Sequence, residues 1–159
     1  LWARRRFRRL SNPSYCDLAS TDYLTQLKNR NAFEVDLENL SDAECEKMGL
    51  ILMDLDNLKE VNDTLGHTAG DQYLRSAADA MRKAACKRAV AYRVGGDEFV
   101  LLVRQTGEKE LEGRPPWNLT LSLSVGWAVF DGNLDAGFWG TYCRADQRMY
   151  ANKQGRRGR

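Results

Sequence analysis

The feature that most constrains the fold is a pair of glycines between two apolar runs. The stretch "YRVGGDEFVLLV", residues 92–103, places Gly95 and Gly96 where the first run ends, and two glycines at such a point are typical of a β-hairpin turn. The second run begins with two acids, Asp97 and Glu98. These acids are either the polar residues of an ordinary solvated turn or part of a functional site.

The composition is that of one globular domain. The chain has 159 residues, of which 43% are hydrophobic and 29% charged, enough to build a hydrophobic core. Its net charge is +2, but much of the positive charge lies in residues 4–9 and 154–159, and the part between them is net acidic. A protein that binds nucleic acid along its surface needs a basic stripe, so we expect no nucleic-acid partner.

The cysteines and the apolar runs bear on the compartment. The four cysteines form no C-x-x-C pair and are far apart in the sequence, so neither a disulfide framework nor a zinc site is indicated. No apolar run is long enough to span a bilayer, and no signal peptide is visible. We therefore expect a cytoplasmic chain. Because it begins with Leu1 rather than Met, we expect a piece of a longer protein. The alternative that this piece is the cytoplasmic domain of a membrane-bound sensor is kept.

Periodicity predicts one sheet, whose hairpin strands are antiparallel, with helices on its faces. We expect helices over residues 29–40, 57–66, 70–86 and 138–153, strands over residues 49–56 and 119–130, and the hairpin over residues 89–103. Gly126 in the last strand is expected to mark a β-bulge. The polar residues 1–16 are expected to form a connector from an upstream domain.

Four acids are candidates for one cation site. The apolar run over residues 49–56 ends in Asp54 and Asp56, and these meet Asp97 and Glu98 if this strand neighbours the hairpin. Carboxylates that converge raise one another's pKa unless a divalent cation lies between them. Magnesium suits such a site because it prefers oxygen ligands and leaves room for substrate phosphates. Adjacent strand residues point to opposite faces, so the last two acids share an ion only if the glycines distort the turn.

Two other phosphate or cation motifs are not favoured. The run "DLDNLKEVNDTLG" starts like a calcium loop, but Leu58 and Lys59 stand where the next ligand and the turn glycine are required. The chain contains no G-x-x-x-x-G-K-[ST] loop, which excludes P-loop chemistry.

Five sequence blocks lie in order between Asp22 and Arg157. They are "DYLTQLKNRNAF", "DLDNLKEVNDTLGHTAGD", "RVGGDEF", "SVG" and "ADQRMYANKQGRR". Together they resemble the catalytic domain of the bacterial GGDEF-type diguanylate cyclases, which join two GTP molecules into the second messenger cyclic di-GMP. The resemblance implies an α+β fold over residues 17–159. Its central, mostly antiparallel sheet would be flanked by helices in the palm-like arrangement of nucleotidyl cyclases, with a ferredoxin-like core.

The resemblance also implies roles for the acids. Asp54 and Asp97 would hold magnesium through their carboxylates, with the Leu55 carbonyl assisting. Glu98 would be a catalytic acidic residue that either helps to activate the attacking 3′-hydroxyl or completes a second metal site. Two Mg²⁺ ions are expected, with Mn²⁺ as a substitute. Lys59 would contact phosphate and complete the catalytic set.

GTP binding would involve further residues. By resemblance, Asn62 and Asp71 would read guanine, and the chemistry agrees, because a carboxylate accepts from guanine N1–H and the 2-amino group together, a donor pair that adenine lacks. Gly95 and Gly96 would let the backbone approach the triphosphate. His67 belongs to this set by resemblance, although a lone histidine at a helix start is more often structural.

Two basic residues near the C-terminus are expected on the phosphates. Lys153 and Arg157 match the family's closing block, and an ammonium and a guanidinium suit that task. Taken alone, both would more often be solvated charges in a basic tail.

One such domain would hold only half of the reaction. The resemblance implies that two domains, each with one GTP, face each other as a two-fold homodimer, whose pairing an upstream sensory or receiver domain would control. The competing hypotheses are a catalytically silent domain that binds GTP or a protein partner as a regulatory module, and a cyclase that accepts ATP. The acids Asp54, Asp97 and Glu98 favour the enzyme, and Asp71 disfavours ATP.

The chain also departs from the family pattern. Gln26 stands where glycine is usual, Asn57 and Leu58 replace the usual aromatic residue, and the segment over residues 104–118 is short. Either the chain lost an element there or residues were dropped from the sequence.

The family's product-inhibition motif, R-x-x-D, is replaced by "CKRA" at residues 86–89. We therefore predict no feedback inhibition through that site. Titration of the purified protein with cyclic di-GMP should leave its activity unchanged, and tight binding at residues 86–89 would contradict the prediction.

Overall fold

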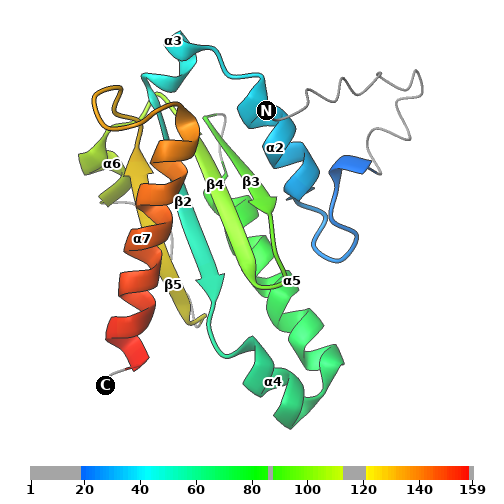
Figure 1. The fold of residues 1–159 in the computed structure, drawn as a ribbon. Helices are drawn as coiled ribbons and strands as arrows, with labels where there is room; N and C mark the ends of the chain where they lie inside the picture. Colours follow the sequence, from blue (N-terminus) through cyan, green and yellow to red (C-terminus); the bar gives the residue numbers. More distant parts are fainter. Residues whose placement is uncertain (1–18, 86–87, 113–120, 158–159) are drawn as a thin grey trace, which may run out of the picture.

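The computed structural model describes residues 19–85, 88–112 and 121–157 (Figure 1). Within them, five strands form one sheet in the order β1-β3-β4-β2-β5. The strands are β1 (Lys28–Asn29), β2 (Met48–Leu55), β3 (Ala89–Arg93), β4 (Glu98–Arg104) and β5 (Leu123–Val129). The helices are α2 (Arg30–Glu38), α3 (Asp42–Cys45), α4 (Leu58–Leu65), α5 (His67–Ala84), α6 (Glu108–Glu112) and α7 (Phe138–Arg157). The expected connector over residues 1–16 lies outside the described residues and stays a prediction.

The pairing of the strands confirms the mostly antiparallel sheet. β2 pairs antiparallel with both β4 and β5, and β3 pairs antiparallel with β4 across the predicted glycine turn. The short β1 is parallel to β3. Every residue of β2 is buried, which explains why its sequence is a continuous apolar run rather than an alternating one.

Helices cover both faces of the sheet (Figure 1). α5 packs on one face through four buried side chains, Leu74, Ala77, Ala78 and Met81. α2 and α7 share the core of the opposite face, to which they contribute Ala32, Phe33, Leu37, Ala145 and Met149. Burial of a large aliphatic or aromatic side chain contributes about 1.5–3 kcal/mol. The two cores therefore hold the helices in fixed positions on the two faces of the sheet.

A buried ion pair fixes the start of α7. The Asp135 carboxylate accepts hydrogen bonds from Arg144 Nε at 2.9 Å and from Thr141 Oγ1 at 2.8 Å. Hydrogen bonding from Arg144 holds the pKa of Asp135 down at about 2. The helix therefore begins at a defined place and runs along the sheet, with its last turns beside the end of β2.

Some element boundaries differ from the sequence prediction. α5 begins at His67 rather than at residue 70, because Gly66 takes a backbone angle φ of +84° that ends α4 and leaves the next residues free to join α5. The short segment after β4 contains α6. Cys45 and Cys143 are free thiols, and the other two cysteines lie outside the described residues. In the described part of the chain, no helix has the length and apolar character to cross a membrane.

The expected bulge at Gly126 is wrong. Leu52 pairs with Gly126, and the ladder continues without interruption on both sides. Glycine is required there for another reason: a Cβ atom at this position would collide with the backbone of α7 at Ala145 and Met149. The residue lets the helix lie directly on the strand.

Replacing Gly126 by alanine should therefore destabilise the fold. Overpacking usually costs about 1–3 kcal/mol, and we expect the upper part of this range because the colliding atoms belong to backbone. Urea unfolding measures the change. The control is Gly155→Ala on α7, where a Cβ would meet nothing within 4 Å, and stability should stay the same or rise by up to about 1 kcal/mol. Equal effects of the two substitutions would contradict this account.

Candidate functional site

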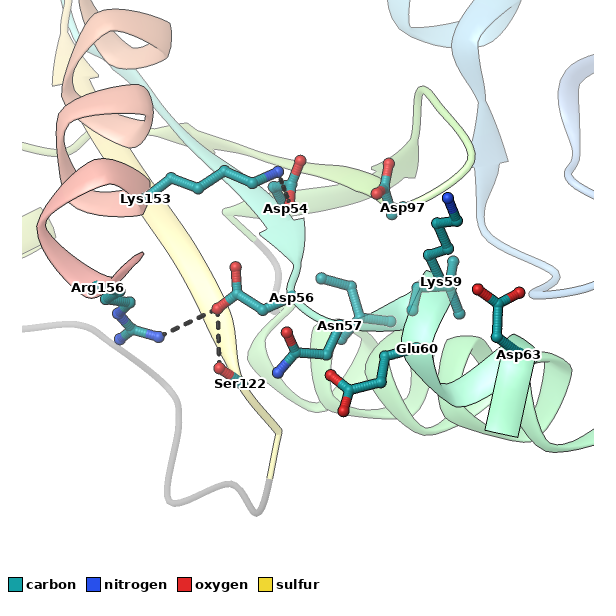
Figure 2. Close-up of a pocket in the computed structure, with 12 residues that line it drawn as sticks. Asp54, Asp56, Asn57, Lys59, Glu60, Asp63, Asp97, Ser122, Lys153 and Arg156 are labelled. Carbon is teal, nitrogen blue, oxygen red and sulfur yellow. Dashed lines mark hydrogen bonds and ion pairs between the residues drawn. The ribbon is translucent and has the colours of Figure 1, made fainter. Parts of the chain in front are cut away.

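Asp54 lies near the end of β2, and Asp97 is the turn residue directly before the neighbouring strand β4, so the two acids are close together, as predicted. Asp54 pairs in register with Glu98, and the Leu55 amide donates to the Asp97 carbonyl at 2.9 Å. Both aspartates line a cleft of about 560 Å³ (Figure 2). The Gly-Gly-Asp-Glu stretch is therefore more than a solvated turn, because its first acid faces a cavity that it shares with the end of β2.

The cleft lies between the end of β2, the first turns of α4 and the last turns of α7 (Figure 2). Both acidic and basic side chains line it, with the acids in the majority. The residues that line it are Asp54, Leu55, Asp56, Asn57, Leu58, Lys59, Glu60, Asp63, Asp97, Ser122, Lys153 and Arg156. Such a mixture suits a ligand that carries both anionic groups and a divalent cation.

Lys153 reaches from α7 to the acid of β2. Its Nζ lies 2.6 Å from Asp54 Oδ1, and Figure 2 shows the extended side chain that spans this gap. The Asp54 side chain is only 9% exposed and that of Lys153 26%. Two partly buried charges at this distance stabilise each other more than an exposed pair does.

Asp56 has a different role from the one expected. Its carboxylate accepts hydrogen bonds from Ser122 Oγ at 2.8 Å and Ser124 Oγ at 2.7 Å, and Arg156 lies 3.3 Å away. These contacts tie the ends of β2, β5 and α7 together. Asp56 is therefore committed to neighbouring protein groups and does not converge with the other three acids as a free ligand.

Glu98 lies opposite Asp54 but does not line the cleft. Burial raises its pKa above the ordinary value, and the carboxylates of Asp97 and Asp54 raise it further. Its side chain also explains one glycine, because a Cβ at Gly95 would collide with the Glu98 carboxylate. A Cβ at Gly96 would meet nothing within 4 Å, so the turn stays open at that residue.

An arginine that was not singled out in the sequence holds the turn in place. Arg93 donates to the Gly96 carbonyl at 2.7 Å and to Asp22 Oδ1 at 3.0 Å. Asp22 in turn accepts from the Thr25 amide at 2.8 Å and from its hydroxyl at 2.6 Å. Arg93 and Asp22 both stand in the sequence blocks quoted above, but they are 71 residues apart in the chain. Only their contact in the structure shows that they hold the backbone that carries Asp97.

Arg156 is a second basic residue that was missed. It lines the cleft beside Lys153, and the spacing of three residues on one helix is the signal that would have found it. Arg157 is the last residue of α7, and its side chain lies outside the described part of the structure.

The residues expected on guanine are not in the cleft lining. Asn62 lies on α4, with its side chain over Gly70 of α5, where a Cβ would collide with the amide. Asp71 follows on α5 and is half-buried, whereas His67 is exposed. The structure thus brings together Asp54, Leu55, Asp97, Lys59 and Lys153, and it places the expected base-reading set on the neighbouring helix pair.

The donors fit magnesium that is shared with a substrate. Asp54, Asp97 and the Leu55 carbonyl offer hard oxygen atoms, and Mg²⁺ is commonly held by one or two carboxylates together with substrate phosphates. Among the described residues, no three His, Cys, Asp or Glu side chains are grouped closely enough to hold a metal alone. Asp54, Asp97 and the Leu55 carbonyl are therefore the candidate ligands for such an ion.

The chain matches a known protein family over most of its length. A family model described as "Diguanylate cyclase, GGDEF domain" covers residues 19–159. The chain is 36% identical over 156 residues to the cyclic di-GMP phosphodiesterase PdeR of Escherichia coli K12, with 89% of this chain and 23% of that protein covered. It is 32% identical over 162 residues to the diguanylate cyclase DosC of the same strain, with 87% and 33% covered. The chain thus spans a third or less of these relatives.

Solved structures agree with this match. The GGDEF domain of DgcB from Caulobacter crescentus, in complex with c-di-GMP, has a TM-score of 0.75 and 30% identity, with 86% of this chain and 89% of that chain covered. The diguanylate cyclase SiaD from Pseudomonas aeruginosa, in complex with its activator SiaC, has a TM-score of 0.74 and 27% identity, with 89% and 61% covered. These likenesses confirm the palm-like α+β fold.

Replacing Glu98 by glutamine should stabilise the fold at neutral and alkaline pH. Because the pKa of Glu98 in the folded state lies above its ordinary value of 4.5, folding favours the protonated side chain. This contribution is fully present below the unfolded pKa and is lost as pH rises through the folded pKa. Glutamine stays neutral, so the variant should have the higher Tm at about pH 8, and the difference should disappear below the ordinary pKa of glutamate.

The matched control for this pH series is Glu38→Gln at the exposed end of α2. Its unfolding free energy should stay within about 0.5 kcal/mol of the parent at both pH values. If the stability of Glu98→Gln changed with pH in the same way as that of Glu38→Gln, the burial of Glu98 beside two other acids would not affect the stability of the fold.

Proposed function

Since the chain belongs to the diguanylate cyclase GGDEF domain family, we propose that it makes cyclic di-GMP. In this proposal it condenses two GTP molecules with release of pyrophosphate, as a magnesium-dependent homodimer. One observation carries the proposal: Asp54 and Asp97 line a single cleft together with Lys59 and Lys153. Two acids for a cation and two ammonium groups for phosphates are the groups that a nucleoside triphosphate requires.

In the proposed complex, Asp54, Asp97 and the Leu55 carbonyl hold Mg²⁺. An ion held there would supply neutralisation of the triphosphate charge and Lewis-acid polarisation of a phosphate oxygen. Lys59 and Lys153 pair with phosphate oxygens, and Arg157 would add a further contact from the end of α7. These residues act by position and charge rather than by forming a covalent intermediate.

Bond formation follows from two such sites facing each other. The 3′-oxygen of each ribose bonds to the α-phosphorus on the other domain, and the bond from that phosphorus to the bridging oxygen breaks. The electron pair leaves with pyrophosphate, so two GTP give one cyclic di-GMP and two pyrophosphates. Glu98 is proposed to accept the hydroxyl proton, for which its raised pKa is suited. Its alternative role, as ligand of a second metal ion, remains part of the proposal.

Base recognition is proposed for the helix pair α4 and α5. Asn62 and Asp71 stand on these helices next to the cleft-lining turn of α4, where Asp71 would accept from the donor edge of guanine. His67 would lie at the rim of this region. Gly95 and Gly96 would keep the turn free of side chains beside the triphosphate.

The longer protein belongs to the proposal as well. Because the chain covers 33% of DosC and 23% of PdeR, we propose that residues 17–159 form one catalytic module, joined through residues 1–16 to a sensory or receiver domain. SiaD is described with an activator protein, and a comparable input is proposed to control the pairing of two modules here.

The second candidate is a catalytically silent domain that binds GTP or a partner. The name of PdeR, a phosphodiesterase, favours it, because membership of the family does not by itself imply synthesis. The acids at Asp54, Asp97 and Glu98 favour the enzyme instead, since all three are retained.

Incubation of the purified protein with magnesium and either GTP or ATP tests the proposal. We expect cyclic di-GMP and pyrophosphate from GTP, and no cyclic product from ATP, by chromatography and mass spectrometry. Glu98→Gln should lower kcat by about 10²–10⁴-fold, as expected for loss of a general base, whereas Glu38→Gln should retain full activity. GTP binding without product would support the silent domain, and a cyclic product from ATP would overturn the assignment of Asp71.

A further inference from the structure

Lys153 occupies the place of a cation at Asp54. Its ammonium lies 2.6 Å from Asp54 Oδ1, within a cleft that both residues line. We propose that Lys153 is an internal counter-ion that must leave Asp54 before a divalent cation binds there, so that metal and nucleotide bind cooperatively. This inference rests on the proposed function, because it concerns the same metal and triphosphate.

Asp54 requires a counter-ion because of its neighbours. It is nearly buried, pairs in register with Glu98, and lies beside the turn that carries Asp97. Among the described residues, Lys153 is the only basic group paired with Asp54, and neither of the other two acids makes an ion pair. A buried carboxylate without a partner is costly, so the ammonium stabilises the protein in the ligand-free state.

The rest of α7 is anchored independently of this pair. Gly126 brings the helix against β5, the Asp135–Arg144 pair fixes its start, and Arg156 pairs with Asp56 in its last turn. The helix therefore has no need to move when Lys153 leaves Asp54. A lysine ammonium on a flexible aliphatic stem can turn away from the carboxylate while the backbone stays in place.

Cooperative binding follows from where the ammonium goes. A metal ion that binds alone displaces Lys153 and leaves its charge in the cleft without a partner. When a triphosphate is present, the released ammonium pairs with phosphate oxygens. The nucleotide therefore raises the affinity for metal, and by thermodynamic linkage metal raises the affinity for nucleotide by the same factor.

The two lysines of the cleft differ in whether their charge is already paired with a carboxylate. Lys59 lines the cleft and makes no ion pair with another described residue, so its charge is available to a phosphate from the start. Lys153 becomes available only when a cation replaces it at Asp54. The part of the coupling that comes from release of a counter-ion is thus assigned to Lys153 and not to Lys59, in addition to any direct contact between the ion and the phosphates.

The test measures Mn²⁺ binding by electron paramagnetic resonance, with and without a GTP analogue that carries a methylene group between its α- and β-phosphates. In the parent protein at about 0.15 M salt, the analogue should raise Mn²⁺ affinity by about 5–150-fold, the usual range of such couplings. Lys153→Met keeps most of the aliphatic stem. It should bind Mn²⁺ alone at least about 5-fold more tightly than the parent, and the analogue should raise its Mn²⁺ affinity by a smaller factor than in the parent.

The matched control is Arg156→Met. It removes a positive charge from the same helix and the same cleft, but from a residue that pairs with Asp56. Because Arg156 pairs with Asp56 rather than with Asp54 and its side chain is half-exposed, Mn²⁺ affinity should rise less than in Lys153→Met. Urea unfolding of both variants verifies that they fold.

Two outcomes overturn the inference, and they are distinguishable. If Lys153→Met binds Mn²⁺ no more tightly than the parent while nucleotide-dependent binding persists, the counter-ion role is wrong and the proposed function stands. If the parent binds Mn²⁺ neither alone nor with the analogue, the metal site itself is wrong and the proposed function fails with it.

Discussion

The antiparallel ladder between β2 and β4 decides the chemistry of this domain. Its register places Asp54 opposite Glu98 and joins the Leu55 amide to the Asp97 carbonyl. A slip of one residue would turn Asp54 to the other face of the sheet. Buried pairs farther along the ladder, such as Ile51 with Leu101 and Met53 with Phe99, hold the register, so the apolar core sets the geometry of the polar edge.

The negative charges at the end of β2 are balanced by basic side chains of α7. Lys153 pairs with Asp54 and Arg156 with Asp56, so each acid at the end of β2 has a basic partner on one helix. Glu98 lacks such a partner among the described residues, and the pKa of its carboxyl is raised. Functional sites commonly retain such local strain at the expense of stability. The two acids at the end of β2 are therefore tolerated in the folded protein because each has a basic partner.

Local sequence patterns were sufficient to predict the helices and strands, but not to explain why particular residues occupy their positions. The hairpin at Gly95-Gly96 and the buried run of β2 were predicted correctly, because turn chemistry and apolar periodicity are local properties. The bulge at Gly126 was predicted wrongly, because the reason for that glycine is the close approach of α7. The contact of Arg93 with the glycine turn was not predicted either, because its second partner, Asp22, lies 71 residues away in the chain.

The sequence alone determined the family, the order of the elements and the set of acids near the turn, because these depend on residue types at short spacing. The tertiary structure decided which acids are available. It turned Asp56 toward two serines, left Glu98 opposite Asp54 but outside the cleft lining, and brought Lys153 to Asp54 across 99 residues of chain. Side-chain direction and long-range pairing depend on strand register and on how a helix lies against the sheet, and no local pattern contains that information.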